Sequence, residues 1–278
     1  MSKPKVTVCC ITYNHEKYIA ECLDGFLLQQ TNFDVEFLIH DDASTDGTQN
    51  VILSKVGNDS RFQLILRKEN IKSTGVPVFP ILYKKAKGDY IALCEGDDYW
   101  TDPLKLQKQV DFLEANSDYV ICFHNTQLYN DNKRTFLEDE ITRKVPDTTT
   151  ILDMAYGNYI HTPSVVFRNS FVLPDWFNQC VLGDWTLYMI IIEGGKVKKL
   201  NDLMCVYRVH ESSLWSSKAK EYRYEKTLEN VRVIKDNYSF TTPVKTILNQ
   251  RLYKNIERKE YRGKYLIKKI KQFFEKYT

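Results

Sequence analysis

The sequence lacks any apolar stretch near the roughly 20 residues that a helix needs to cross a lipid bilayer. No apolar signal segment precedes the first expected strand, which begins near residue 5. From these two absences we expect a cytoplasmic protein. Hydrophobic residues make up 43% of the chain and charged residues 27%, so the composition excludes a disordered or collagen-like protein.

Two kinds of short motif are also missing. The seven cysteines are odd in number, scattered and never spaced as Cys-x-x-Cys, which argues against a disulfide or zinc framework. No Gly-x-Gly-x-x-Gly follows the first expected strand, and no Gly-x-x-x-x-Gly-Lys-Ser/Thr occurs anywhere. The sequence therefore gives no support to dinucleotide-dependent redox chemistry or to P-loop phosphoryl transfer.

The first hundred residues do show a regular alternation of strand-like and helix-like segments. Helical periodicity follows the first strand, with Asn14 as a candidate N-cap, and returns around residues 51–56. Such alternation predicts right-handed crossovers and a doubly wound, mostly parallel sheet. The four expected strands are residues 5–11, 35–40, 62–66 and 90–94.

The rest of the chain is less regular. Its polar segment, residues 130–150, has the composition of a mobile loop. From residue 218 onward the pattern is helical, with a break at Thr241-Thr242-Pro243. The other expected elements are helices at 102–115 and 184–193 and strands at 119–129, 164–168 and 203–208.

Three carboxylates, Glu95, Asp97 and Asp98, follow the fourth expected strand. Adjacent carboxylates repel one another, and their burial is costly unless a cation lies among them. A hard divalent cation with oxygen ligands is the usual partner. The alternative is an acidic turn before a helix, because Asp102 is a good N-cap and Pro103 suits the first helical position. The residues alone leave both interpretations open.

Tyr13 and Asp42 also lie at the carboxyl ends of expected strands. In a doubly wound sheet, ligands bind outside this edge. We therefore expect these two residues to line one crevice together with Asp97 and Asp98.

At this point the pattern resembles the family 2 inverting glycosyltransferases with the GT-A fold. The resemblance covers residues 5 to about 215 and rests on an ordered set of motifs. In chain order these are Thr12-Tyr13-Asn14, Asp41-Asp42-Ala43-Ser44-Thr45-Asp46-Gly47-Thr48, Ala86-Lys87-Gly88-Asp89-Tyr90-Ile91, Glu95-Gly96-Asp97-Asp98, Gly183-Asp184 and Tyr207-Arg208-Val209-His210.

The resemblance implies roles for the matching residues of the first half. Thr12 and Tyr13 would contact the base of a nucleotide sugar, and Asp42 would hydrogen-bond the pyrimidine or its ribose. Asp98 would be the direct ligand of Mn²⁺ or Mg²⁺, with Asp97 nearer the donor ribose or sugar.

The matching residues of the second half would serve catalysis and the leaving group. Asp184 matches the catalytic base, His210 a position that reaches the metal or pyrophosphate, and Arg208 could help to neutralise the pyrophosphate. Two departures from the family pattern stand out. Glu95 occupies a position where many members have Asp, and residues 75–83 carry prolines where the family often has Arg and Asn near the donor.

The implied fold is α/β, a GT-A domain with a doubly wound, mostly parallel sheet and a helical C-terminal extension. The implied activity is metal-dependent inverting transfer of a sugar from a nucleotide donor, expected to be UDP-linked, to a glycan or lipid-linked acceptor in bacterial surface polysaccharide synthesis. Trp100 and Trp185 are possible sugar platforms, and no nucleic-acid partner is expected. The expected division is a GT-A domain at 1–217, with a nucleotide-sugar half at 1–102 and an acceptor half at 103–217, and the helical extension at 218–278.

The single residues also allow simpler interpretations. Asp42 could be a helix-start residue, Asp184 the N-cap of the helix after it, and His210 an ordinary loop histidine. His15 and His161 have no spacing that suggests a metal site and are expected as structural or surface residues, with a place on the acceptor side as the alternative for His161.

Other functions remain open on the residues alone. A nucleotidyltransferase usually needs a Gly-rich, basic phosphate loop, which is missing here. A glycoside hydrolase with paired carboxylates would not need Asp42 or a nucleotide pocket. A non-catalytic protein of the same fold would bind nucleotide without turnover.

The net charge of +3 is unevenly spread, because residues 251–278 hold ten Lys or Arg against three Glu. Aromatic and aliphatic residues lie between these cations at helical spacing. We expect either a basic amphipathic helix on the anionic inner face of a membrane or a helix packed on the body with a solvated basic face.

Overall fold

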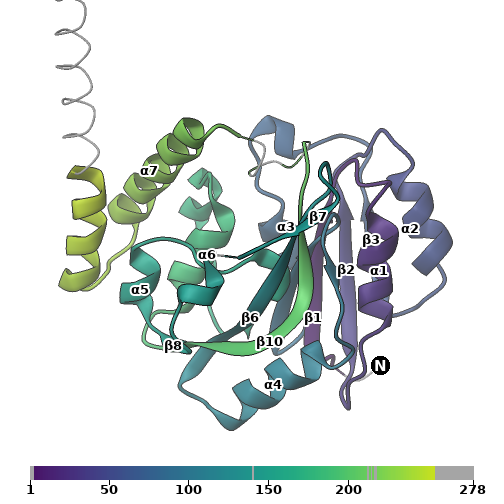
Figure 1. Cartoon of the computed structure of the whole chain (residues 1–278), viewed down its shortest axis with the longest axis horizontal. Helices are drawn as coiled ribbons and strands as arrows, with labels where there is room; N and C mark the ends of the chain where they lie inside the picture. The colour runs from purple at the N-terminus through teal and green to yellow at the C-terminus, as the bar shows by residue number, and fades with distance from the viewer. Residues whose placement is uncertain (1–2, 140, 212, 214, 216–217, 254–278) are drawn as a thin grey trace, which may run out of the picture.

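The computed structural model describes residues 3–139, 141–211, 213, 215 and 218–253 (Figure 1). Within these residues, ten strands form one sheet in the order β3-β2-β1-β4-β9-β6-β10-β5, with β7 beside β6 and β8 beside β10. The strands are β1 (Val6–Thr12), β2 (Val35–Asp41), β3 (Phe62–Leu66), β4 (Tyr90–Glu95), β5 (Tyr99–Trp100), β6 (Tyr119–Asn130), β7 (Thr135–Leu137), β8 (Thr148–Thr149), β9 (Val166–Arg168) and β10 (Lys196–Val209). The α-helices are α1 (Ile19–Leu27), α2 (Thr48–Val56), α3 (Phe79–Tyr83), α4 (Lys105–Ala115), α5 (Ile151–Ala155), α6 (Gly183–Ile191) and α7 (Lys220–Asn237).

The first half of the sheet is entirely parallel. β1 pairs with β2 on one side and with β4 on the other, and β2 pairs with β3. All residues of β1 except Ile11 are buried, as expected for an interior strand covered on both faces. The four strands predicted from the alternating pattern coincide with β1 to β4, so the predicted doubly wound, parallel arrangement is confirmed for this half.

The second half of the sheet is mixed. β9 lies antiparallel between β4 and β6, whereas β6 and β10 run parallel to each other. β10 has 14 residues and is much longer than the strand expected at 203–208. The expectation of a structureless loop at 130–150 was wrong, because β7 and β8 pair there with β6 and β10. β7 forms a local hairpin with β6, and β8 pairs with β10 about fifty residues further along the chain; local composition reveals neither pairing.

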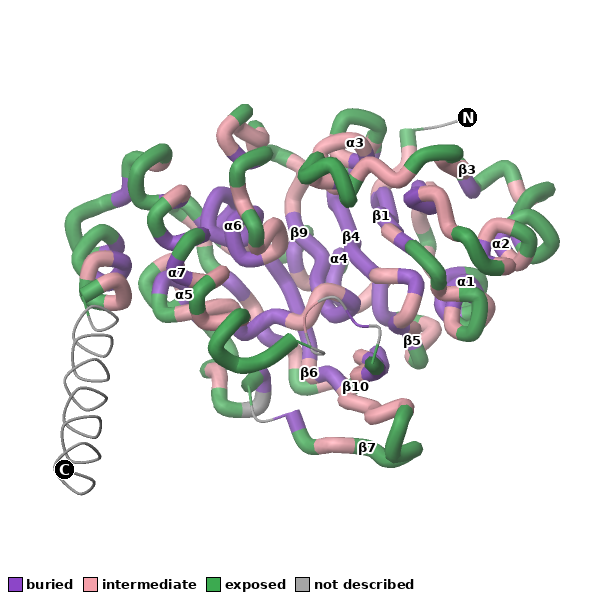
Figure 2. Tube along the Cα trace, turned by 90° about the horizontal axis from the view of Figure 1, so that it is seen from above, coloured by how far each residue is buried: buried purple, intermediate pink, exposed green. Residues whose placement is uncertain are grey.

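Helices cover both faces of the sheet. Apolar residues of α1, α2 and α4 pack against one face, and those of α3, α5, α6 and α7 against the other. Figure 2 shows the result as buried strands in the middle of the molecule, with exposed positions on the surrounding helices and loops. The three layers agree with the predicted α/β class.

The helices after residue 218 belong to the same core in the described region. Val231 and Ile234 of α7 lie in one hydrophobic cluster with Trp185 of α6. A further helix begins at Thr242 and continues to the last described residue of this region. Its Arg251 lies over the Trp185 ring at 4.5 Å.

Most of the basic segment 251–278, for which we expected either membrane contact or a helix packed on the body, lies outside the described residues. Among the residues that are described, no helix has the length and apolar character required to span a membrane.

Candidate active site at the carboxyl edge of the sheet

Thr12, Asp41 and Glu95 are the last residues of β1, β2 and β4, and they define what we call the carboxyl edge. Thr12 pairs with Asp41 in register, and Ile11 with Glu95. Thr12 is buried, and its Oγ1 has no hydrogen-bond partner among the described residues. The neighbouring Tyr13 is 39% exposed. Tyr13 is therefore accessible at the edge where the sequence predicted a nucleotide base to bind.

Asn14 links the loops that follow β1 and β2. Its side-chain oxygen accepts the Thr45 N–H at 2.8 Å, and its own N–H donates to Ser44 Oγ at 2.8 Å. Its backbone is left-handed, with φ of 54°, a region that Asn tolerates better than most residues. The expectation that Asn14 caps the first helix was wrong, since α1 begins five residues later at Ile19.

Asp42 is buried and organises the loop after β3. Its Oδ1 accepts the Ile71 N–H and its Oδ2 the Lys72 N–H, both at 3.0 Å. It does not start α2, because Asp46 accepts the Thr48 N–H at 3.0 Å at that helix start. The structure thus places Asp42 at the carboxyl edge and connects it to the segment that carries Lys72.

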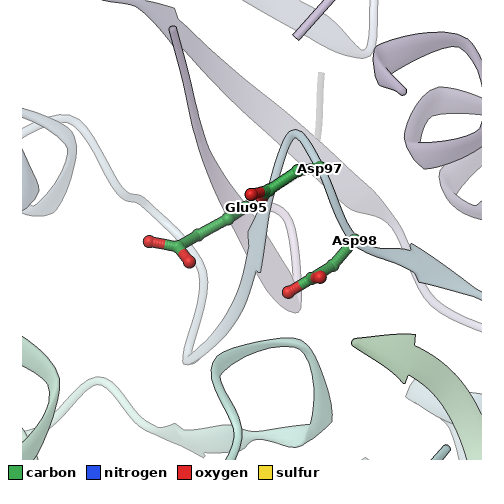
Figure 3. Close-up of side chains that lie close together, drawn as sticks. All are labelled: Glu95, Asp97 and Asp98. Carbon is green, nitrogen blue, oxygen red and sulfur yellow. The ribbon is translucent and has the colours of Figure 1, made fainter. Parts of the chain in front are cut away.

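The acidic cluster, Glu95, Asp97 and Asp98, surrounds the turn between β4 and β5 (Figure 3). One carboxylate oxygen of each residue lies within 4.8 Å of those of the other two. The interpretation as a mere acidic turn before a helix does not explain this convergence, because α4 begins only at Lys105. Three converging carboxylates are the oxygen donor set that Mn²⁺ and Mg²⁺ take.

The electrostatics of the acidic cluster favour a bound cation. Burial, together with the charge of Asp97, raises the pKa of Asp98 well above its usual range. Burial and Asp97 also raise the pKa of Glu95 to about 7, although the nearby Lys72 opposes this. Asp98 Oδ2 and Asp97 Oδ1 are buried and have no hydrogen-bond partner among the described residues. For Asp98, an unpartnered oxygen on a carboxylate whose ionised form is disfavoured is what a metal ligand shows before the ion neutralises it.

Arg208 anchors the acidic cluster from β10. Its N–H donates to Asp98 Oδ1 at 2.8 Å, and its Nη1 donates to the Asp97 carbonyl oxygen at 2.6 Å. The guanidinium also pairs with Glu21 and lies over the Tyr99 ring at 4.4 Å. Arg208 therefore joins β10, the turn after β4 and helix α1, with its charge next to the cluster.

Two histidines approach the same carboxylate. His210 Nε2 lies 3.0 Å from Asp97 Oδ2, and His15 Nε2 lies 3.7 Å from that atom. Although burial raises the pKa of Asp97, the hydrogen bond from His210 and the charge of His15 outweigh it, and the net shift is downward. Sequence spacing gave no signal for His15. Only its position directly after the strand-end motif Thr12-Tyr13-Asn14 could have suggested it.

Asp184 lies in the first turn of α6. Leu182 is the N-cap residue of this helix and has no side-chain cap, so the capping role considered for Asp184 is not what the helix start shows. Asn158 Nδ2 donates to Asp184 Oδ2 at 2.7 Å. Burial raises the pKa of Asp184 despite the opposing backbone N–H groups of this turn and Asn158. The charge of Asp184 in turn contributes to the raised pKa of Glu95. The Asp184 carboxylate, whose raised pKa makes it a better proton acceptor, thus comes from the second half and lies near the acidic cluster.

Trp100 and Trp185 are both buried. The indole N–H of Trp100 donates to the Pro163 carbonyl oxygen at 2.8 Å, and that of Trp185 to the Met154 carbonyl oxygen at 2.9 Å. A sugar platform needs an exposed ring face, so the expectation for these two residues was wrong. Their polar atoms are satisfied internally, as is usual for buried Trp.

With this geometry in view, we compared the chain with known proteins. Residues 7–171 match the family described as Glycosyl transferase family 2. The chain belongs to this family. Family 2 membership confirms the resemblance seen in the sequence motifs. The matched residues contain the motifs of the first half, whereas Gly183-Asp184 and Tyr207-Arg208-Val209-His210 lie after them.

Curated family 2 relatives support the assignment. An uncharacterised protein of Mycobacterium tuberculosis is 38% identical over 220 residues, which are 76% of this chain and 61% of that relative. The chain therefore spans about three fifths of the length of this mycobacterial relative. An Escherichia coli protein named UDP-Glc:alpha-D-GlcNAc-diphosphoundecaprenol beta-1,3-glucosyltransferase WfaP is 29% identical over 217 residues, 78% of this chain and 82% of the relative.

Solved structures confirm the GT-A fold. TarS 1–349 of S. aureus, in complex with UDP-GlcNAc, superposes with a TM-score of 0.63 at 21% identity, covering 89% of this chain and 70% of TarS 1–349. The mannosyltransferase PcManGT of Pyrobaculum calidifontis, in complex with GDP-Man and Mn²⁺, gives 0.64 at 18% identity, covering 91% and 70%. At these identities the likeness concerns the fold alone.

Proposed function

We propose that this family 2 protein is a metal-dependent inverting glycosyltransferase that moves a sugar from a UDP-linked donor to a glycan or lipid-linked saccharide. The observation that carries the proposal is the acidic cluster at the carboxyl edge, with the basic carboxylate of Asp184 close to it. The relatives support the choice of donor and acceptor, because WfaP is named for a UDP-Glc donor and a diphosphoundecaprenol-linked acceptor.

The residues present fit Mn²⁺ or Mg²⁺. Asp98 would be the direct ligand through its unpartnered Oδ2, with Asp97 beside it. His210, whose Nε2 lies 3.0 Å from Asp97 Oδ2, would complete the ligand set from the end of β10. When bound, the ion would act as a Lewis acid on the charge that develops on the departing diphosphate.

The remaining steps belong to the chain's own side chains. Thr12, Tyr13 and Asp42 would bind the nucleotide at the carboxyl edge, and the Arg208 guanidinium would add positive charge near the diphosphate. Asp184 would take the proton of the acceptor hydroxyl as that hydroxyl attacks the anomeric carbon from the face opposite the leaving diphosphate. Attack from the opposite face inverts the configuration at that carbon. The raised pKa of Asp184 suits this role, because it makes the carboxylate a better proton acceptor.

The cellular setting follows from the same proposal. Bacillus subtilis TuaG, named a putative teichuronic acid biosynthesis glycosyltransferase, is 24% identical over 90% of this chain. We place the protein in bacterial surface polysaccharide synthesis, at the cytoplasmic side of the membrane. The cations of residues 251–278 would hold it on anionic lipids. Flotation with phosphatidylglycerol vesicles at low salt tests this, and failure of the full chain to float would remove the membrane contact.

The central experiment measures donor binding with and without metal. A panel of UDP- and GDP-sugars should raise the unfolding temperature in Mn²⁺ and lose this effect in chelator, because bound donor stabilises by mass action. Calorimetry with UDP should show that Asp98→Ala loses the metal-dependent part of the binding, whereas Asp118→Ala, an exposed acid paired with Lys196, keeps it. Equal UDP affinity with and without chelator would disprove the metal assignment.

The same panel separates the rival functions. A nucleotidyltransferase would turn over nucleoside triphosphates, and a glycoside hydrolase would act without any nucleotide. A non-catalytic member of the fold would bind UDP yet release no sugar from UDP-sugars in the presence of Mn²⁺ and acceptor.

A further inference from the structure

A buried acid–histidine pair lies in the second half of the protein and has no part in the steps above. Asp139 Oδ2 is 3.3 Å from His161 Nε2, and the Asp139 side chain is 1% exposed. Its Oδ1 accepts the N–H groups of Ile141 and Thr142 at 3.0 and 3.1 Å. Although burial opposes ionisation, His161 and the groups of Thr142 lower the pKa of Asp139 to about 2. Asp139 is thus a carboxylate fixed by backbone N–H groups, and its Oδ2 faces His161 Nε2 at ion-pair distance, without hydrogen-bond geometry.

His161 lies next to both parts of the proposed active site. Its ring packs against the Tyr207 ring with centroids 5.0 Å apart. Tyr207 precedes Arg208 on β10. Burial raises the pKa of its phenol, and the charges of Asp98 and Asp184 raise it further. When it is protonated, His161 also lowers the pKa of Asp184.

The loop that carries His161 serves Asp184 directly. Asn158, three residues earlier, donates to Asp184 Oδ2 at 2.7 Å, and its own Oδ1 accepts the Ile160 N–H at 3.0 Å. The His161 carbonyl oxygen accepts hydrogen bonds from the N–H and the hydroxyl of Ser164. One short, internally bonded segment therefore sets the positions of both Asp184 and the imidazole.

We propose that His161 binds the acceptor saccharide beside the hydroxyl that Asp184 deprotonates, and that Asp139 is the positioning residue for His161. The inference rests on the proposed glycosyl transfer. Because Nε2 faces the Asp139 carboxylate, the neutral ring is favoured with its proton on Nε2, and Nδ1 is then a hydrogen-bond acceptor, which suits a sugar hydroxyl. The His161 side chain keeps 15% exposure, so a ligand can reach it. Its place beside Asp184, rather than at the carboxyl edge of β1 and β2, favours the acceptor over the nucleotide.

The competing explanation is that the contact between Asp139 and His161 only holds residues 139–142 and 158–161 together. The same segments are already joined without His161, because Thr142 Oγ1 donates to the Tyr159 carbonyl oxygen at 3.1 Å. Thr142→Val breaks that tie and keeps the imidazole and the two backbone N–H groups that donate to Asp139 Oδ1, while it removes the Thr142 hydroxyl, which also lowers the pKa of Asp139. It is therefore the matched control for a purely structural role.

The test compares His161→Ala, His161→Gln, Asp139→Asn and Thr142→Val with the parent chain. The donor is the UDP-sugar that the parent uses, and the acceptor probe is α-GlcNAc diphosphate on a short alkyl chain. For His161→Ala we expect the KM of the acceptor to rise about tenfold, the loss of one substrate hydrogen bond. The KM of the donor, UDP binding and slow donor hydrolysis without acceptor should stay close to the parent. His161→Gln should recover part of the loss, Asp139→Asn should show a smaller loss, and Thr142→Val should behave like the parent.

Three results would overturn the inference. These are an unchanged acceptor KM in His161→Ala, an equal loss of donor and acceptor affinity, or a loss in Thr142→Val as large as that in His161→Ala. Failure of the proposed function looks different, because the parent itself would then neither hydrolyse a UDP-sugar nor transfer it to the probe.

Discussion

The acidic cluster and Asp184 come from halves of the sheet that are assembled in different ways. The cluster follows β4 in the parallel half, where successive strands and helices lie close in sequence and pair in register. Asp184 starts a helix in the mixed half, where β9 inserts antiparallel between β4 and β6. The side proposed to bind the donor is therefore specified by local alternation, and the side proposed to bind the acceptor by pairing between distant segments.

Glu95 and Asp98 of the acidic cluster differ from Asp184 in what raises the pKa of the carboxylate. In the acidic cluster, burial acts together with the charge of a neighbouring carboxylate, as Asp97 does on Asp98 and Glu95. For Asp184 the upward shift comes from burial, opposed by a few hydrogen-bond donors. A cation relieves the first situation and is not needed for the second. This difference fits metal binding on one side and proton acceptance on the other.

Asp184→Asn has the largest expected effect, and it distinguishes the rate of transfer, which should fall, from UDP affinity, which should not. Transfer should fall by ~10²–10⁴-fold, the usual cost of removing a general base, because the amide no longer accepts a proton. UDP affinity in Mn²⁺ should change little, since the acidic cluster and Asp42 are untouched. Initial rates of transfer and calorimetry on the same preparation check both parts.

Asp153→Asn controls for damage to a helix start. Asp153 belongs to a true capping box at the start of α5, where its Oδ2 accepts the Thr150 N–H at 2.8 Å. This variant should lose stability and keep its rate per folded molecule. If Asp184→Asn behaves in the same way, the base must lie elsewhere in the second half.

Alanine substitution of one glycine in each half tests the same comparison with a smaller expected effect. A Cβ on Gly96 would lie 2.6 Å from Thr12 Oγ1 and 3.0 Å from His15 Nδ1, so β1 or the turn after β4 must shift. Gly96→Ala should weaken UDP binding in Mn²⁺ by about tenfold, in line with the ~1–3 kcal/mol of an overpacked site. A Cβ on Gly183 meets only the far end of the Phe177 ring at 3.6 Å. Gly183→Ala should therefore bind UDP like the parent, and equal losses in both variants would contradict the comparison.

The parallel half was predictable because its signals are local. Alternating segments gave β1 to β4, and residues at strand ends, such as Tyr13 and Asp42, were correctly expected at one edge of the sheet. The partners of these residues were not predictable. Asp42 holds the N–H groups of Ile71 and Lys72, and that contact depends on the path of a loop rather than on a repeating pattern.

The mixed half was less predictable for a physical reason. β7 and β8 are short strands that depend on backbone pairing with β6 and β10, and a polar segment carries no periodic signal for this. The burial of Trp100 and Trp185 likewise depends on carbonyl groups far away in sequence. The pairing of Asp139 with His161 belongs to the same class, because the two lie 22 positions apart with β8 and α5 between them.

Lys105 lies where the two halves meet, and its replacement should have the smallest effect. It is fully buried at the start of α4, over the Trp100 ring at 4.2 Å, with Nζ donating to Gln109 Oε1 at 2.8 Å. Burial lowers the pKa of Lys105 from 10.5 to about 8. Its charged form therefore reduces the stability of the folded protein at neutral pH, by up to about 3 kcal/mol.

Lys105→Met should raise the free energy of unfolding at pH 7 by about 1 kcal/mol. This is what remains after the hydrogen bond to Gln109 and the contact of the cation with the Trp100 ring, each about 1 kcal/mol, are lost. The sign of the pH dependence follows from the lowered pKa. Between about pH 8 and 10.5 the unfolded chain holds a proton on Lys105 that the folded protein has released, so the parent gains stability as pH rises and the advantage of the variant shrinks. Urea unfolding at pH 7, 8.5 and 10 measures this difference.

Lys108→Met, on the same helix and paired with Asp102 and Asp202 at the surface, is the control, since the pKa of Lys108 is raised and its removal should bring no gain at pH 7. A Lys105→Met variant that is less stable than the parent at pH 7, or whose advantage does not change with pH, would show that the buried ammonium strengthens the junction of the two halves instead of straining it.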